Sequence, residues 1–112
     1  GTRPAVVYFG GRSEEVSWVV RDAGKLFPGM AVLAVNYRGY GDSHGDPAET
    51  HMIEDGCTLF DWMAAHHHVD PRRIAVVGRS LGSGVAVQVA KERPVHAVVL
   101  ITPWHWPSAS SA

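Results

Sequence analysis

The chain has 112 residues and a formal net charge of -1, and 46% of its residues are hydrophobic. This length fits one small domain, and the hydrophobic content is typical of a packed globular protein. The near-neutral charge argues against nucleic acid as a partner, and no apolar run approaches the roughly 18 residues that a membrane-spanning helix needs. Cys57 is the only cysteine, which excludes an internal disulfide and favours a cytoplasmic location.

The first third of the chain predicts two strands with a helix between them. The apolar, β-branched run 4–9 predicts a short strand that ends at two glycines. Apolar residues then recur at helical spacing over 16–23, Ser13 is placed to cap that helix, and residues 27–29 end it. The continuous apolar run 31–36 predicts a strand that is covered on both faces, as in a parallel sheet.

The rest of the chain continues the alternation of helix and strand. Residues 37–46 are rich in glycine and aspartate and predict a loop, and a helical stripe follows up to residue 64. A strand is expected over 73–77, a helix over 81–93 and a last strand over 95–101. The helix over 81–93 is built from small residues, which lets a helix lie close to a sheet.

Strands that alternate with helices predict parallel pairing and an α/β fold. We expect three layers, in which a parallel sheet of about four strands carries helices on both faces. This domain is expected over residues 1–103. Residues 104–112 are rich in serine and alanine, and we expect an irregular tail there.

The strongest chemical signal is a G-x-S-x-G motif that runs from Gly78 to Gly82, between a predicted strand and a predicted helix. This context is the one that a nucleophile elbow requires. The turn is too sharp for side chains at the two glycine positions, and it holds Ser80 in a strained conformation with its hydroxyl above the sheet. The amide of Leu81, at the head of the next helix, can then donate to an oxyanion that forms on the substrate.

A second oxyanion donor is expected after the first strand, where Gly10 and Gly11 let the backbone approach the substrate. The amide of Arg12 is the candidate donor. The alternative is a plain glycine turn that leads into a helix.

Four segments together resemble a known family: 8–11, 36–43, 70–74 and 78–84. They resemble the α/β-hydrolase superfamily, in the branch of serine hydrolases similar to serine-aminopeptidase-like and palmitoyl-thioesterase-like enzymes. The resemblance implies that Ser80 attacks an ester, thioester or amide carbonyl, and that the Arg12 and Leu81 amides form the oxyanion hole. It implies an acyl substrate and no cofactor or metal. Many members have His-Gly where this chain has Gly10-Gly11, a tolerable departure because the backbone is the donor.

In this family the triad acid and then the histidine follow the serine. After Ser80 the chain offers only Glu92, His96 and His105. Glu92 is near a helix end, and His96 begins a strand, at the sheet end opposite the active site. We therefore expect a central fragment of the fold that is catalytically incomplete by itself, because a serine without a base is a poor nucleophile.

The other histidines offer little to catalysis or metal binding. His66, His67 and His68 are adjacent, so their side chains diverge around a helix, and a solvated helix end is expected there. His44 lies in the loop after the second strand and is a weak candidate for the base.

Two other functions stay open. The run from Gly78 to Gly84 also matches the G-x-x-x-G-x-G cofactor loop of short-chain dehydrogenases, although that family places its loop after the first strand. The third possibility is a non-catalytic partial domain. An incomplete sheet exposes its edges, which favours self-association.

Overall fold

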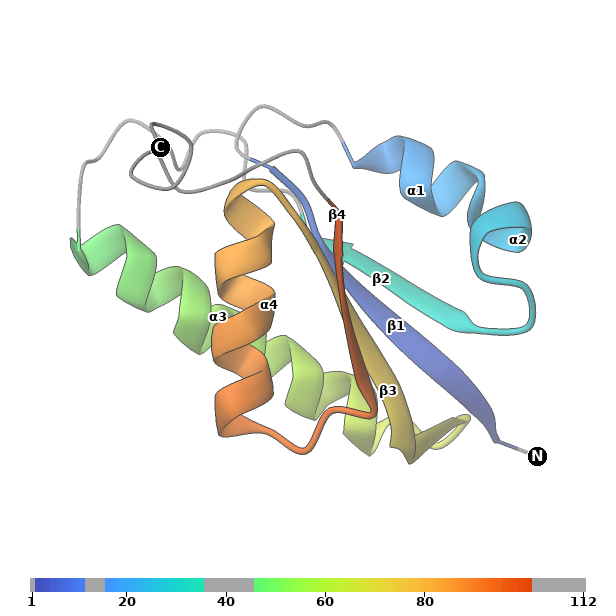
Figure 1. Ribbon diagram of the computed structural model, residues 1–112. Coiled ribbons are helices and arrows are strands. Elements are labelled where there is room, and N and C mark those ends of the chain that lie inside the picture. The colour runs from blue at the N-terminus through green and yellow to red at the C-terminus, as the bar shows by residue number, and fades with distance from the viewer. Residues whose placement is uncertain (1, 12–15, 36–45, 102–112) are drawn as a thin grey trace.

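The computed structural model describes residues 2–11, 16–35 and 46–101, which form strands and helices in alternation (Figure 1). The elements in chain order are β1 (Arg3–Phe9), α1 (Ser17–Arg21), α2 (Ala23–Leu26), β2 (Ala31–Val35), α3 (Asp46–Ala65), β3 (Val69–Arg79), α4 (Leu81–Glu92) and β4 (Ala97–Ile101).

The four strands form one parallel sheet in the order β2-β1-β3-β4. Phe9 at the end of β1 lies opposite Val35 on one side and Gly78 on the other, and Gly78 lies opposite Leu100 of β4. This register brings the carboxyl ends of all four strands to one edge of the sheet. The expected parallel sheet of about four strands is confirmed.

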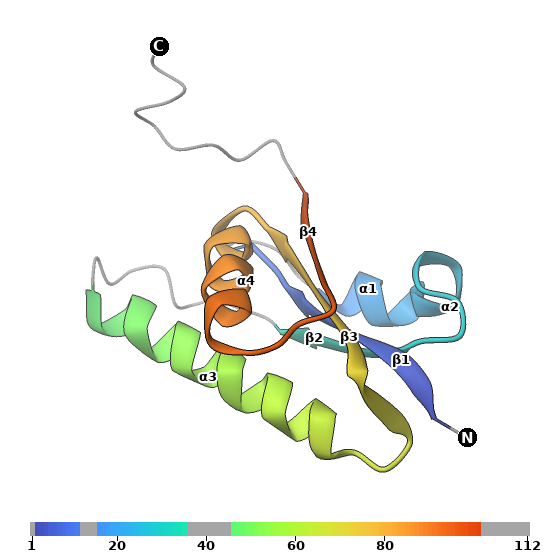
Figure 2. The same ribbon diagram turned by 60° about the horizontal axis from the view of Figure 1, so that its bottom comes forward.

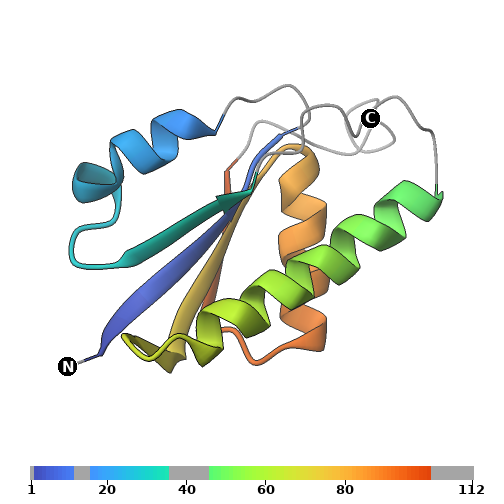
Figure 3. The ribbon, with the colours of Figure 1, turned by 180° about the vertical axis from the view of Figure 1, so that it is seen from behind.

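Helices cover both faces of the sheet, which confirms the three-layer prediction (Figures 1, 2 and 3). Side chains alternate between the faces of a strand, so β1 supplies both cores. Val7 and Phe9 pack in the cluster beneath α3 and α4. Val6 and Tyr8 pack on the opposite face, with Val19 of α1. Burial on both faces explains why β1 is apolar without interruption over residues 5–9.

The structure shifts three of the expected boundaries. The single helix expected to end at residues 27–29 is two short helices, because the Asp22 amide caps α1 while the Asp22 carbonyl accepts the first bonds of α2. The third strand starts at Val69, four residues early, and its pairing with β1 shifts register between Val69 and Ile74. The last strand starts at Ala97, two residues late.

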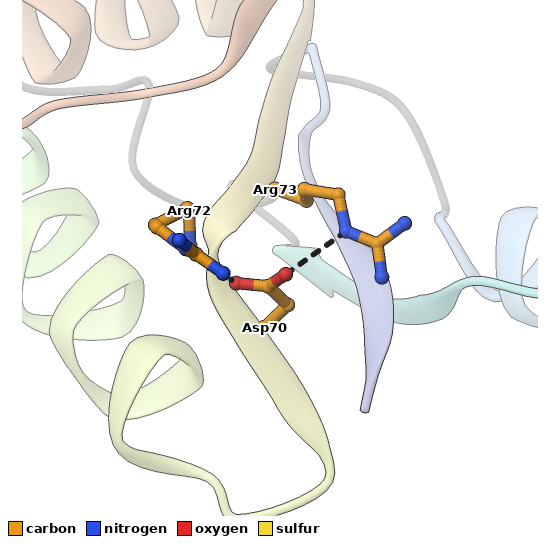
Figure 4. A network of polar contacts seen from close by, with 3 residues as sticks. All are labelled: Asp70, Arg72 and Arg73. Carbon is orange, nitrogen blue, oxygen red and sulfur yellow. Dashed lines mark hydrogen bonds and ion pairs between the residues drawn. The ribbon is translucent and has the colours of Figure 1, made fainter. Parts of the chain in front are cut away.

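The polar network at this register shift is shown in Figure 4. The Asp70 carboxylate accepts hydrogen bonds from the Arg72 amide at 3.0 Å and from Arg73 Nε at 3.0 Å. The hydrogen bond from the Arg72 amide is the largest of the effects that lower the pKa of Asp70. Proline has no amide to donate, so Pro71 suits the irregular stretch that Asp70 holds together.

Strand β4 lies at an edge of the sheet and exposes apolar side chains on both faces. Val98, Val99 and Leu100 are 39%, 49% and 47% exposed. The expected self-association through a sheet edge stays a prediction. Among the helices of the described residues, none combines the length and the apolar character needed to cross a bilayer. Residues 102–112, which include the expected tail, and Ser13 lie outside the described residues, and the domain boundary at 103 stays a prediction.

Candidate active site

Ser80 occupies the turn between β3 and α4, at the carboxyl edge of the sheet. Its backbone has φ 57° and ψ -122°, and no other described residue except glycine has a positive φ. A conformation of this kind costs about 1–3 kcal/mol and persists only where the surroundings impose it. Although Ser80 is the N-cap of α4, its side chain makes no capping hydrogen bond. The hydroxyl is therefore not engaged by the first turn of the helix that it precedes.

Two glycines impose this turn. A Cβ added to Gly82 would overlap the carbonyl oxygen of Phe9 and would come within 2.7 Å of the Gly10 carbonyl oxygen. A Cβ added to Gly78 would overlap the carbonyl oxygen of Gly82. The head of α4 thus packs on the end of β1, backbone against backbone, with no room for a side chain between them. The contact with β1 explains the glycine at position 82, and the contact with the backbone of Gly82 and Ser83 explains the glycine at position 78.

The loop that follows β1 reaches the same point. Gly10 and Gly11 are buried, and the Gly10 amide donates to the Val35 carbonyl of β2 at 3.2 Å. A Cβ built on Gly11 would lie 3.2 Å from Ser80 Cβ and 3.6 Å from Ser80 Oγ. Two segments that are almost 70 residues apart in sequence therefore meet at the serine.

Helix α4 directs its N-terminus to this site. The Ser83 amide donates to the Ser80 carbonyl at 2.9 Å, which closes the first turn. The side chain of Leu81 is half-buried and packs against the core cluster under α3 and α4, so its backbone is anchored beside Ser80. The first amides of a helix have no intrahelical acceptor and carry the positive end of the helix dipole. The amide of Arg12, the other expected donor, lies outside the described residues.

The strand order places the site where ligands of α/β sheets usually bind. From β1 the chain crosses to β2 on one side, and from β3 it crosses to β4 on the other side. The connections thus diverge between β1 and β3. In open α/β sheets this point, outside the carboxyl ends of the strands, is the usual ligand site.

Four histidines lie at the opposite edge of the sheet. His66, His67 and His68 follow α3 and precede β3, and the rings of His67 and His68 are 4.0 Å apart. The His96 amide donates to the Ile74 carbonyl, six residues before Ser80, which is roughly 20 Å along an extended strand. Within the described residues, no set of three histidine, cysteine or carboxylate side chains could hold a metal ion. His44 and His105 lie outside the described residues.

One contact at the site has no signal in the sequence. The Phe9 carbonyl lies against Gly82, and an ordinary apolar strand residue gives no indication that its carbonyl supports the elbow.

The segment 70–74, which contributes to the resemblance, lies at the amino end of β3 and therefore far from Ser80.

The match to a known family covers the whole chain. A family model described as serine aminopeptidase, S33, matches residues 1–112. The chain belongs to this α/β-hydrolase family. Membership in this family favours an α/β-hydrolase fold over the dehydrogenase-like interpretation of the glycine run 78–84.

Sequence relatives come from bacteria and vertebrates. An uncharacterized Mycobacterium tuberculosis protein, Rv2307c, is 39% identical over 105 residues, which are 93% of this chain and 37% of that protein. Human protein ABHD12B is 41% identical over 81 residues, which cover 68% of this chain and 22% of the relative. The chicken lysophosphatidylserine lipase ABHD12 is 37% identical over 81 residues, with coverages of 68% and 21%. The chain therefore spans between about a fifth and little more than a third of the length of these relatives.

Solved esterases share the fold. The structure of EstE1, a thermophilic carboxylesterase cloned from a metagenomic library, matches 99% of this chain and 43% of its own, with a TM-score of 0.70 and 25% identity. The Pyrobaculum calidifontis esterase matches 81% of this chain and 31% of its own, with a TM-score of 0.64 and 30% identity. These neighbours confirm the predicted α/β-hydrolase fold.

Proposed function

We propose that the protein is a serine ester hydrolase in which Ser80 forms the acyl-enzyme. The observation that carries the proposal is the strained backbone of Ser80 at the carboxyl edge of the sheet, where β1, β3 and α4 meet. Ser80 Oγ would attack the substrate carbonyl while its proton passes to a base. The bond to the leaving alcohol then breaks, the alcohol takes up the proton, and water releases the acyl group in a second cycle of the same kind.

The oxyanion of the tetrahedral intermediate would accept hydrogen bonds from two backbone amides, those of Leu81 and Arg12. The Leu81 amide is supported by its place in the first turn of α4, beside Ser80. The Arg12 amide is supported by the position of Gly11 against the serine. Fixed backbone donors of this kind stabilise charge as it develops, and loss of one donor typically costs about 10²–10³-fold in rate.

Carboxylic esters are the substrates that the comparisons favour over thioesters and amides. EstE1 is described as a carboxylesterase, and the chicken relative ABHD12 is described as a lysophosphatidylserine lipase. Hydrolysis of such an ester by this mechanism uses no cofactor and no metal. A cytoplasmic location stays a prediction.

We propose that the general base comes from outside the described residues. His66, His67, His68 and His96 are at the amino edge of the sheet, and Ser80 is at the carboxyl edge. His51 is exposed on α3. Without a base at Ser80, only binding and oxyanion stabilisation remain, so the described part alone would react slowly.

The test is covalent labelling of Ser80 with a fluorophosphonate probe. Ser80 Oγ would form a bond to phosphorus, the P–F bond would break, and fluoride and the serine proton would leave. We expect labelling of the wild type and of a Ser83→Ala control, and none of Ser80→Ala. Ser83 is the matched control because it belongs to the same helix turn. Equal labelling of Ser80→Ala and the wild type would remove the assignment.

The same experiment addresses the non-catalytic alternative. A protein that unfolds cooperatively but is not labelled, even in a longer version that includes flanking sequence, would be a non-catalytic domain. Labelling of the longer version only would support a base that lies outside this chain.

A further inference from the structure

A Cβ added to Gly11 would lie closer to the proposed nucleophile than non-bonded carbon atoms normally approach. A Cβ at this position would be 3.2 Å from Ser80 Cβ, 3.6 Å from Ser80 Oγ and 3.6 Å from the Arg79 carbonyl oxygen. Carbon atoms that are not bonded to one another normally approach to about 3.5–4.0 Å, so the shortest of these distances requires a neighbour to move. The neighbour that would have to move is the serine itself.

The serine has little freedom to move. Its turn is fixed by Gly78 and Gly82, whose α-carbons pack on backbone atoms of the elbow and of the end of β1. The end of β1 is held in turn by the bond from the Gly10 amide to β2. Gly11 and Ser80 are therefore held at a fixed separation by main-chain contacts on both sides.

Space, and not backbone conformation, is what requires glycine at position 11. In the described residues, the glycine with φ in the left-handed region is Gly29, so Gly11 adopts a φ that alanine also tolerates. A methyl group added at Gly11 would thus remain beside Ser80 and would occupy the volume next to its hydroxyl.

We propose that the bare α-carbon of Gly11 forms the wall of the acyl site beside Ser80 and is a specificity-determining feature that sets how large an acyl group the serine accepts. The inference rests on the proposed nucleophilic role of Ser80. An acyl group that reacts with Ser80 Oγ would lie next to that atom, and a Cβ at Gly11 would lie 3.6 Å from the same atom, at the end of β1. A methyl group there would exclude large acyl groups more strongly than small ones.

The experiment compares Gly11→Ala with the wild type in the intact protein, using two fluorophosphonates that carry a short and a long alkyl group. We expect Gly11→Ala to slow labelling by the long-chain probe about tenfold or more, and labelling by the short-chain probe much less. Gly24→Ala is the matched control, because a Cβ at Gly24 of α2 meets nothing within 4 Å. The control should be labelled by both probes at the wild-type rate.

Equal slowing of both probes, or no slowing, would overturn the role of Gly11 while leaving Ser80 as the nucleophile. Absence of labelling both in this chain and in a longer version that includes flanking sequence would instead overturn the proposed function.

If Gly11→Ala folds poorly, a stability measurement tests the contact between the added methyl group and Ser80. Gly11→Ala is introduced into the Ser80→Gly background, in which the atom nearest to the new methyl group is missing. We expect the fall in urea midpoint to be at least halved in that background, because the two substitutions couple through direct contact. An equal fall in both backgrounds would show that the added methyl group does not meet Ser80, and the proposal would be wrong.

Discussion

At the scale of the single residue, Ser80 combines reactivity with backbone strain. Its φ of 57° is disfavoured for any residue with a side chain, and the glycines at 78 and 82 leave the turn no alternative. The strain keeps the side chain away from the capping position that an N-cap serine normally takes.

This strain has a measurable consequence for stability. We expect Ser80→Gly to be more stable than Ser80→Ala by about 1 kcal/mol, because glycine adopts a positive φ without steric cost and alanine does not. Both variants lack the hydroxyl, so the difference between their stabilities reports the cost of the backbone conformation at position 80. Urea unfolding of the two variants measures it. A Ser80→Ala variant at least as stable as Ser80→Gly would contradict the observed backbone angles.

At the scale of the element, α4 contains glycines of two kinds. Gly82 is buried against Phe9 and Gly10, whereas Gly84 is exposed and a Cβ there meets nothing within 4 Å. The first is a requirement of packing between α4 and β1. The second only lowers the intrinsic stability of the helix.

Alanine at these two positions should therefore have opposite effects. We expect Gly84→Ala to stabilise the protein by up to ~1 kcal/mol, which is the difference in helix propensity. Gly82→Ala should destabilise it by more than about 3 kcal/mol, because main-chain atoms cannot yield as a flexible side chain would. Thermal unfolding of the pair provides the measurement, and a well-folded Gly82→Ala protein would refute the described contact between α4 and β1.

At the scale of the whole molecule, stabilising charges and the proposed chemistry lie at opposite edges of the sheet. Arg93, which caps the end of α4, donates from Nε to Asp61 of α3 at 2.8 Å and from a terminal nitrogen to the other carboxylate oxygen at 3.0 Å. This side-chain bond is the main effect that lowers the pKa of Asp61. Asp70, whose pKa is also lowered, begins the irregular stretch of β3. Both carboxylates are remote from the elbow.

The lowered pKa of Asp70 predicts a pH dependence of stability. The folded state binds the proton of this carboxyl less tightly than the unfolded state does. The resulting stabilisation is complete above the unfolded pKa of about 4, and it is lost as the pH falls below that value. We expect the stability of Asp70→Asn to fall less steeply than that of the wild type in acid. Urea midpoints between about pH 7 and pH 3 provide the measurement.

The position of Asp70 also predicts what should not change. The rate of Ser80 labelling at neutral pH should be the same in Asp70→Asn and in the wild type, since the substitution lies at the other edge of the sheet. If the urea midpoints of the two proteins fall equally as the pH is lowered, the Asp70 carboxylate does not stabilise the folded state in the way proposed.

The sequence by itself determined the alternation of strand and helix, the parallel sheet and the residues of the elbow. Short apolar runs and apolar patterns of period 3.6 are local, and a glycine pair around Ser80 has few other physical explanations. The same local information placed Gly10 and Gly11 at the end of the first strand.

Only the tertiary structure decided how these pieces meet. The order β2-β1-β3-β4 brings the end of β1 beside the end of β3, and this pairing sets Gly11 against Ser80. The early start of β3 and the division of the first helix at Asp22 depend on pairing and capping contacts that no local pattern encodes. A contact between residues 11 and 80 depends on strand register, and register is set by the packing of both faces of the sheet together.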